Sequence, residues 1–97
     1  MDKLKDKIYG INMSEELVKK WLDKKNIDQV IKDNVLLGDT CNGLLLNQLW
    51  QTNKTSPQFF NHIFIAFFKI KLDNVFNANS AREKIKGFAD ALEKLFN

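Results

Sequence analysis

The chain has 97 residues, which is enough for one small domain with a single hydrophobic core. Its net charge of +3 suits an acidic partner surface but is smaller than nucleic-acid-binding proteins usually carry. The single cysteine, Cys41, excludes an intrachain disulfide and is typical of a reducing compartment. We therefore expect one domain in which Cys41 is a buried structural thiol.

No membrane span or secretory signal is indicated. The longest apolar run, Ile63–Phe68, is far shorter than the roughly 20 residues that span a bilayer. The N-terminal lysines alternate with Asp2 and Asp6, and no apolar stretch follows them. The sequence therefore predicts a cytoplasmic protein without a membrane partner.

Residues 1–13 are predicted to be a loose lead-in, and residues 14–97 a single helical domain. Ser14 should cap the first helix, with Glu15 and Glu16 beside the positive end of its dipole. Helical spacing puts four apolar residues on the inner side: Leu17, Val18, Trp21 and Leu22. Four lysines should face outward: Lys19, Lys20, Lys24 and Lys25.

Asn26 should end this helix. Ile27, Val30 and Ile31 then predict a short amphipathic helical segment that closes near residues 33–34. The following apolar residues 35–37 are expected to form a buried lead-in to the next helix.

The stretch Asp39–Trp50 is predicted to be the centre of the fold. A helix through Gly43–Gln51 carries apolar side chains nearly all round, and such a helix is buried. Asp39 or Thr40 should cap it, and Gly43 should allow close approach of another backbone. The apolar side chains are Leu44, Leu45, Leu46, Leu49 and Trp50. The alternative is a hairpin of residues 35–37 against 44–46, but such short arms without alternation are poor strands.

A second core helix is predicted after a polar loop over Gln51–Ser56. Pro57 suits the first helical position, where its missing N–H is not needed. His62 is expected to be half-buried among the phenylalanines. The apolar residues at helical spacing are Phe59, Phe60, Ile63, Phe64, Phe67 and Phe68. A strand over residues 63–72 is the alternative, because these residues are also β-prone.

Asp73–Asn79 is predicted to be a loop that buries Val75 and Phe76. Ser80 and Glu83 then fit a capping box at the start of the last helix. That helix carries a one-sided apolar pattern: Ile85, Phe88, Ala89, Leu92, Leu95 and Phe96. The fold class predicted is all-α, a compact bundle of four or five helices around a buried central helix.

No pattern for catalysis or cofactor binding is present. The acidic residues are spread beside lysines along predicted helix exteriors, and Cys41 has only His62 as a possible chemical partner. Phosphate-binding loops, zinc spacing and the EF-hand pattern are absent from the sequence. The phenylalanines follow core spacing and do not alternate with basic residues, which argues against nucleic acid. We predict a non-enzyme without cofactor or metal.

The segment Trp21–Asn26, with the letters WLDKKN, precedes Asn42–Leu49, with the letters NGLLLNQL. Between them lies an apolar spacer: Ile27, Val30, Val35 and Leu36. This pattern resembles a calponin-homology domain. In that family a tryptophan on the first long helix precedes, at a similar distance, a glycine that opens the buried central helix.

The dipeptide Phe59-Phe60 and the stretch Lys71–Phe76 look most like divergent calponin-homology domains at the amino end of sperm-flagellar and central-pair ciliary proteins. The resemblance covers residues 14–97. It departs at Asn42, where the family usually has an acidic residue. The family's last core helix would follow Asn97, so the resemblance implies a fragment or a shortened variant.

The resemblance implies a non-catalytic cytoskeletal or axonemal interaction module that binds microtubules or a ciliary partner. Its candidate contacts with an acidic, tubulin-like surface are Lys19, Lys20, Lys24 and Lys25, followed by Lys69 and Lys71. Its implied location is the cytoplasm, at the cytoskeleton or cilium.

Two other functions remain open at this point. Asn47–Phe68 can be read as the helix pair of a death-fold-like adaptor that self-associates. A small prokaryotic or phage helical immunity or inhibitor protein is the other alternative.

Overall fold

The computed structural model describes residues 10–35 and 41–97, and over these ranges it contains helices, turns and loops but no strand. The α-helices are α2 (Glu15–Lys24), α3 (Gln29–Val35), α4 (Gly43–Thr55), α5 (Pro57–Leu72) and α6 (Ala78–Phe96). A short 3₁₀ helix, η2 (Asp73–Val75), joins α5 to α6. The predicted all-α fold is confirmed. The alternatives, a hairpin through residues 44–46 and a strand over 63–72, are wrong, because both stretches are helical.

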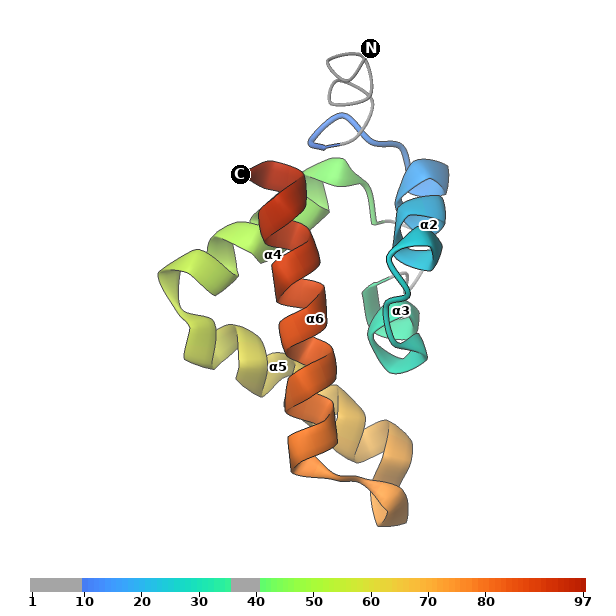
Figure 1. The fold of residues 1–97 in the computed structure, drawn as a ribbon, viewed down its shortest axis with the longest axis vertical. Helices are drawn as coiled ribbons and strands as arrows, with labels where there is room; N and C mark the ends of the chain where they lie inside the picture. Colours follow the sequence, from blue (N-terminus) through green and yellow to red (C-terminus); the bar gives the residue numbers. More distant parts are fainter. Residues whose placement is uncertain (1–9, 36–40) are drawn as a thin grey trace.

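Figure 1 shows α6 running along the long axis of the molecule. The corner between α4 and α5 lies on one side of α6, and α2 and α3 lie on the other. α5 passes behind α6, so α4, α5 and α6 contact one another, and α3 also contacts α5. The molecule measures 46 × 25 × 20 Å.

The core lies where α5 and α6 cross. Phe60, Phe64 and Phe68 recur at intervals of four residues along α5 and are each at most 2% exposed. The ring of Phe88 on α6 lies 6.1 Å from that of Phe60 and 5.5 Å from that of Phe64. Each fully buried phenylalanine contributes about 1.5–3 kcal/mol, so this cluster is a main source of stability. The predicted phenylalanine helix is confirmed, but Phe59 near its start is 56% exposed and is not part of this core.

The expectation that α4 is buried nearly all round is wrong. Leu46 is fully buried, but Leu44 is 51% exposed and Leu45 is 36% exposed. Helix α4 packs on α5 and α6, which leaves part of its surface uncovered. An apolar pattern therefore predicted the helix correctly but overstated how much of it is covered.

The polar loop predicted over Gln51–Ser56 is also wrong, because α4 continues to Thr55. Nothing in residues 51–55 breaks a helix, and the Thr52 hydroxyl donates a hydrogen bond to the carbonyl oxygen of Gln48 at 2.9 Å. Pro57 disfavours helical backbone at the preceding residue, and Ser56 is indeed not helical, with φ −146° and ψ 83°. Only Ser56 therefore separates α4 from α5.

Asparagines cap two helices where other residues were expected. The side-chain oxygen of Asn42 accepts from the amide of Leu45 at 3.0 Å, and Asp39 and Thr40 lie outside the described residues. Asn77 accepts from the amide of Ser80 at 3.0 Å, so α6 begins at Ala78. The predicted capping box at Ser80 is wrong, because Ser80 already lies within the first turn. The Ser14 cap of α2 is confirmed.

Two predictions of burial are wrong at the α5–α6 connection and on α5. Val75 is 74% exposed, since η2 lies at one end of the molecule, whereas Phe76 is partly buried against the core. His62 is exposed on the polar side of α5 and does not lie among the buried phenylalanines.

Two residues at the end of the predicted lead-in are packed, because Gly10 and Met13 are buried, whereas Ile11 is 50% exposed. Met13 is 2% exposed and closes a turn by donating its amide to the carbonyl oxygen of Gly10. The amide of Gly43 donates to the carbonyl oxygen of Met13 at 2.9 Å. This bond satisfies one of the N–H groups that the start of a helix leaves without an intrahelical partner. The predicted close backbone approach at Gly43 is confirmed.

Candidate functional site

The four lysines of the first helix lie on its outer side. Val18, Trp21 and Leu22 are at most 3% exposed and hold α2 on the core. The residues on the other sides of the helix then face solvent, and all four lysines are exposed. We call Lys19, Lys20, Lys24 and Lys25 the α2 lysine surface.

The charge of this surface is not purely positive. Glu15 and Glu16 lie in the first turn of α2, next to its positive dipole end, and the lysines follow toward its negative end. Asp23 forms an ion pair with Lys32 of α3, with 2.6 Å between Nζ and Oδ1. Because Glu15 and Glu16 both lie in the first turn, the C-terminal end of α2, with Lys24 and the capping residue Lys25, carries more of the basic residues.

The other two predicted contacts, Lys69 and Lys71, lie in the last turn of α5. Figure 1 shows this turn displaced from α2 along the long axis of the molecule. Lys71 forms an ion pair with Asp33 of α3 at 3.7 Å, and the Lys69 ammonium lies 5.9 Å from the Phe76 ring centre. The structure therefore does not bring the six predicted lysines onto one surface.

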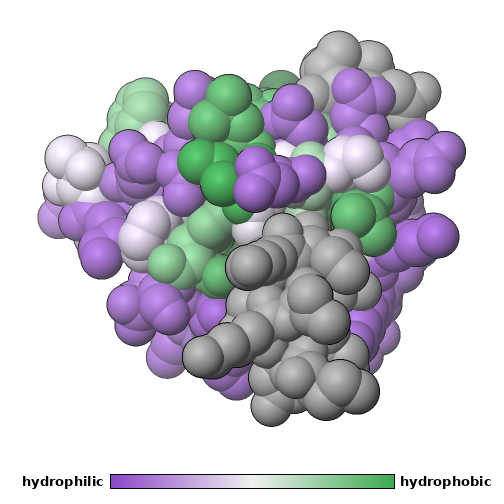
Figure 2. Space-filling model, turned by 90° about the horizontal axis from the view of Figure 1, so that it is seen from above, coloured by the Kyte–Doolittle hydropathy of each residue, from purple (hydrophilic) through white to green (hydrophobic). Residues whose placement is uncertain are grey.

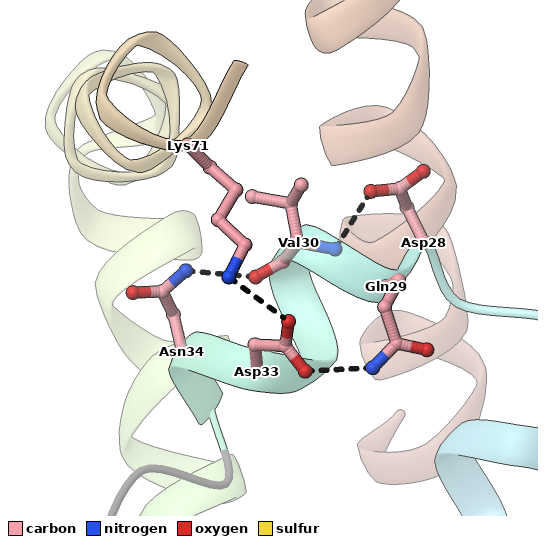
Figure 3. A network of polar contacts seen from close by, with 6 residues as sticks. All are labelled: Asp28, Gln29, Val30, Asp33, Asn34 and Lys71. Atoms are coloured by element: carbon pink, nitrogen blue, oxygen red, sulfur yellow. Dashed lines mark hydrogen bonds and ion pairs between the residues drawn. The ribbon is translucent and has the colours of Figure 1, made fainter. Parts of the chain in front are cut away.

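Helix α3 and Asp28, the residue just before it, form ion pairs with three other helices. Figure 3 shows Asp33 at the centre of one group, where it pairs with Lys71 and accepts a hydrogen bond from Gln29 at 2.6 Å. Asp28, just before α3, accepts from the Val30 amide and pairs with Lys84 of α6 at 3.1 Å. Such exposed pairs are each worth no more than about 1 kcal/mol, so they orient α3 more than they stabilise it.

Cys41 is fully buried, as predicted. Burial, with a smaller contribution from the negative charge of Glu15, raises the pKa of its thiol from 9.0 to about 11. A thiol with so high a pKa is almost entirely protonated near neutral pH, and the thiolate is the reactive form. The arrangement therefore suits a packing role and not a nucleophile.

The described ranges hold neither a cluster of metal-binding side chains nor a membrane-spanning helix. No three His, Cys, Asp or Glu side chains lie close enough together there to hold a metal ion. Each helix in these ranges is too short or too polar to cross a lipid bilayer.

One basic pair was missed by the sequence reasoning. Arg82 and Lys86 lie one turn apart on α6 and line a groove against α4 and α5. Their spacing of four residues was a visible signal, because it places both on one side of a helix. The groove itself depends on how three helices pack.

Comparisons of the chain with known protein families, with curated proteins and with solved structures find no match. The resemblance to calponin-homology domains therefore stays a prediction.

Proposed function

We propose that the chain is a non-catalytic interaction module that docks on an acidic protein surface through the α2 lysine surface. The observation that carries this proposal is the exposure of all four lysines on a helix whose opposite side is anchored by Val18, Trp21 and Leu22. An anchored helix presents its charges in a constant arrangement, which favours recognition of a complementary surface.

The calponin-homology resemblance makes tubulin, or an axonemal complex, the partner to test first. Microtubule binding through lysines would be electrostatic and would depend on salt, because charges at an exposed interface are screened beyond about 10 Å at 0.1 M salt. The corresponding location would be the cytoskeleton or cilium.

Microtubule co-sedimentation at low and high salt tests this proposal. We expect binding at low salt, a marked loss at high salt, and roughly tenfold weaker binding when Lys20 and Lys25 are both replaced by glutamate. Neither lysine forms an ion pair with another described residue, so the replacement breaks no salt bridge seen there.

The matched control replaces Lys54 of α4 and Lys94 of α6 by glutamate, because it changes the net charge equally at exposed positions of other helices, outside the α2 lysine surface. It should retain most of the binding. An equal loss in both double variants would show a response to net charge alone and would remove the α2 lysine surface. Absence of binding at low salt would remove the microtubule as partner.

Self-association is a second candidate, favoured by large apolar side chains that the fold leaves exposed. Leu44 on α4 and Phe59 on α5 are 51% and 56% exposed, and Ile11 is 50% exposed. Figure 2 shows one end of the molecule, where hydrophobic groups lie between hydrophilic ones. Size-exclusion chromatography over a range of concentrations tests this candidate. Growth to open-ended oligomers would favour it, and a monomer throughout would exclude it.

A further inference from the structure

A shallow groove of about 330 Å³ runs between the α4–α5 corner and α6. The buried side chains of Phe60 and Ile85 give its lining an apolar part, together with Pro57 and Ala89. The polar side chains around them are Asn53, Asn61, Arg82, Lys86 and Asp90. Three separate helices thus contribute to one concave surface.

The two cations of the groove come from one helix. Arg82 and Lys86 are four residues apart on α6, so they project from the same side, and both are exposed. Arg82 is the only arginine in the sequence. Neither cation has an ion pair, a hydrogen bond or a ring contact within the described ranges. Two like charges at this spacing cost a helix a few tenths of a kcal/mol, and no ion pair with an acidic side chain of the described ranges offsets that cost.

The amides across the groove are also available. Asn53 near the end of α4 and Asn61 on α5 are partly exposed, and neither side chain forms a hydrogen bond to another described residue. A primary amide both donates and accepts, so the pair matches the N–H and C=O groups of an extended peptide. Asp90 marks the other end of the polar lining, one turn beyond Lys86.

We propose that this groove binds a short acidic peptide segment of a partner protein. A carboxylate of the segment pairs with Arg82 and Lys86, since the planar guanidinium holds carboxylates through two parallel hydrogen bonds. A neighbouring apolar side chain of the segment packs on the exposed parts of Pro57 and Ala89, because Phe60 and Ile85 beneath them are already buried. The negative charge of Asp90 disfavours a polyphosphate or nucleic acid, and it requires a neutral or basic residue of the peptide at that end.

This site is separate from the α2 lysine surface. Figure 1 shows the α4–α5 corner on one side of α6 and α2 on the other. The chain would thus carry two recognition surfaces facing different directions. Failure of microtubule binding would leave the groove untouched, because the peptide test uses another probe and depends on loss of binding when Arg82 and Lys86 are replaced.

Selection from a library of random short peptides displayed on phage tests the proposal with the intact chain as target. We expect enriched peptides that combine Asp or Glu with a large apolar residue. Their affinity, measured by fluorescence anisotropy, should fall roughly tenfold or more when Arg82 and Lys86 are both replaced by glutamate. Amide resonances of Asn53, Asn61 and Ile85 should shift when a selected peptide is added.

The matched controls are Lys94→Glu, on the same helix but outside the groove, and the double variant of Lys20 and Lys25. Both should bind the selected peptides within about twofold of the unaltered chain. Selection without acidic enrichment would overturn the proposal. Equal binding by the Arg82 and Lys86 variant, with its circular dichroism unchanged, would do the same.

Discussion

The amide of Gly43 donates to the carbonyl oxygen of Met13, and the backbone of residues 10–13 lies directly against the start of α4. A Cβ atom at position 43 would overlap the carbonyl oxygen of Gly10 and lie 2.8 Å from the carbonyl group of Ile11. Backbone atoms cannot move aside as the end of a flexible side chain can. Glycine is therefore required at this position by contact between two segments 30 residues apart.

We expect Gly43→Ala to lower the free energy of unfolding by about 3 kcal/mol, because the added methyl group displaces the N-terminal segment. The matched control is Gly87→Ala, at an exposed position within α6 where the added atom meets nothing within 4 Å. That replacement should raise stability by about 0.5–1 kcal/mol through helix propensity. Urea unfolding of both variants measures the difference, and equal effects would contradict the close contact at Gly43.

Cys41 should make stability depend on alkaline pH. Its pKa is raised from 9.0 to about 11 in the folded state, so the unfolded chain loses the thiol proton first as the pH rises. The contribution is fully present below about pH 9 and is lost between about pH 9 and pH 11, where it amounts to roughly 2–3 kcal/mol. The difference in unfolding free energy between the chain and Cys41→Ala should shrink by this amount over that interval. A constant difference would contradict the raised pKa.

At the scale of a helix, the apolar pattern of α4 predicts the helix correctly but does not predict which of its leucines are buried. Its leucines were all expected inside, but the helix is covered only where α5 and α6 contact it. Leu46 is fully buried, whereas Leu44, two residues earlier, is half exposed. The same residue type on the same helix therefore contributes very differently to the core.

We expect Leu46→Ala to cost roughly 2–5 kcal/mol of unfolding free energy, as loss of a buried leucine does. Leu44→Ala should cost less than about 1 kcal/mol, because its side chain is already half solvated. Thermal or urea unfolding of the two variants measures these two losses of unfolding free energy. Similar losses in both would mean that α4 is covered on its outer side as well.

The whole molecule has one core that connects two groups of helices. Buried residues of α2 and α3 belong to the same cluster as those of α4, α5 and α6. Trp21 lies in the first group at 3% exposure. Trp50 lies in the second, where its indole N–H donates to Glu93 of α6 at 2.6 Å and its ring lies 5.5 Å from that of Phe96.

A shared core predicts that both groups unfold together, and the two tryptophans provide a separate reporter for each. In Trp50→Phe the remaining indole reports on α2, and in Trp21→Phe it reports on α4 and α6. In each variant we expect the fluorescence transition in urea to coincide with loss of helix by circular dichroism. An earlier fluorescence transition in Trp50→Phe alone would show that α2 detaches before the rest of the bundle unfolds.

Local sequence signals predicted much of the fold. The caps and breakers at Ser14, Asn26 and Pro57, and the apolar spacing around Phe64 and Phe88, predicted helices that the structure confirms. These signals act within one or two turns, so they can be recognised without knowledge of the fold. Two predictions from the same kind of local signal are wrong. Asn77 and not Ser80 caps α6, and residues 51–55 continue α4.

Local sequence signals did not predict the arrangement of the candidate sites. The sequence by itself established that the chain is helical, mildly basic and supplied with lysines on the outer side of its first helix. The packing of α3, α4 and α5 around α6 decides the rest. It determines which lysines share a surface, which leucines of α4 stay exposed, and that a groove forms beside Arg82. Periodicity states which side of a helix is apolar. It does not state which neighbour covers that side, because coverage arises from contacts between residues far apart in the chain.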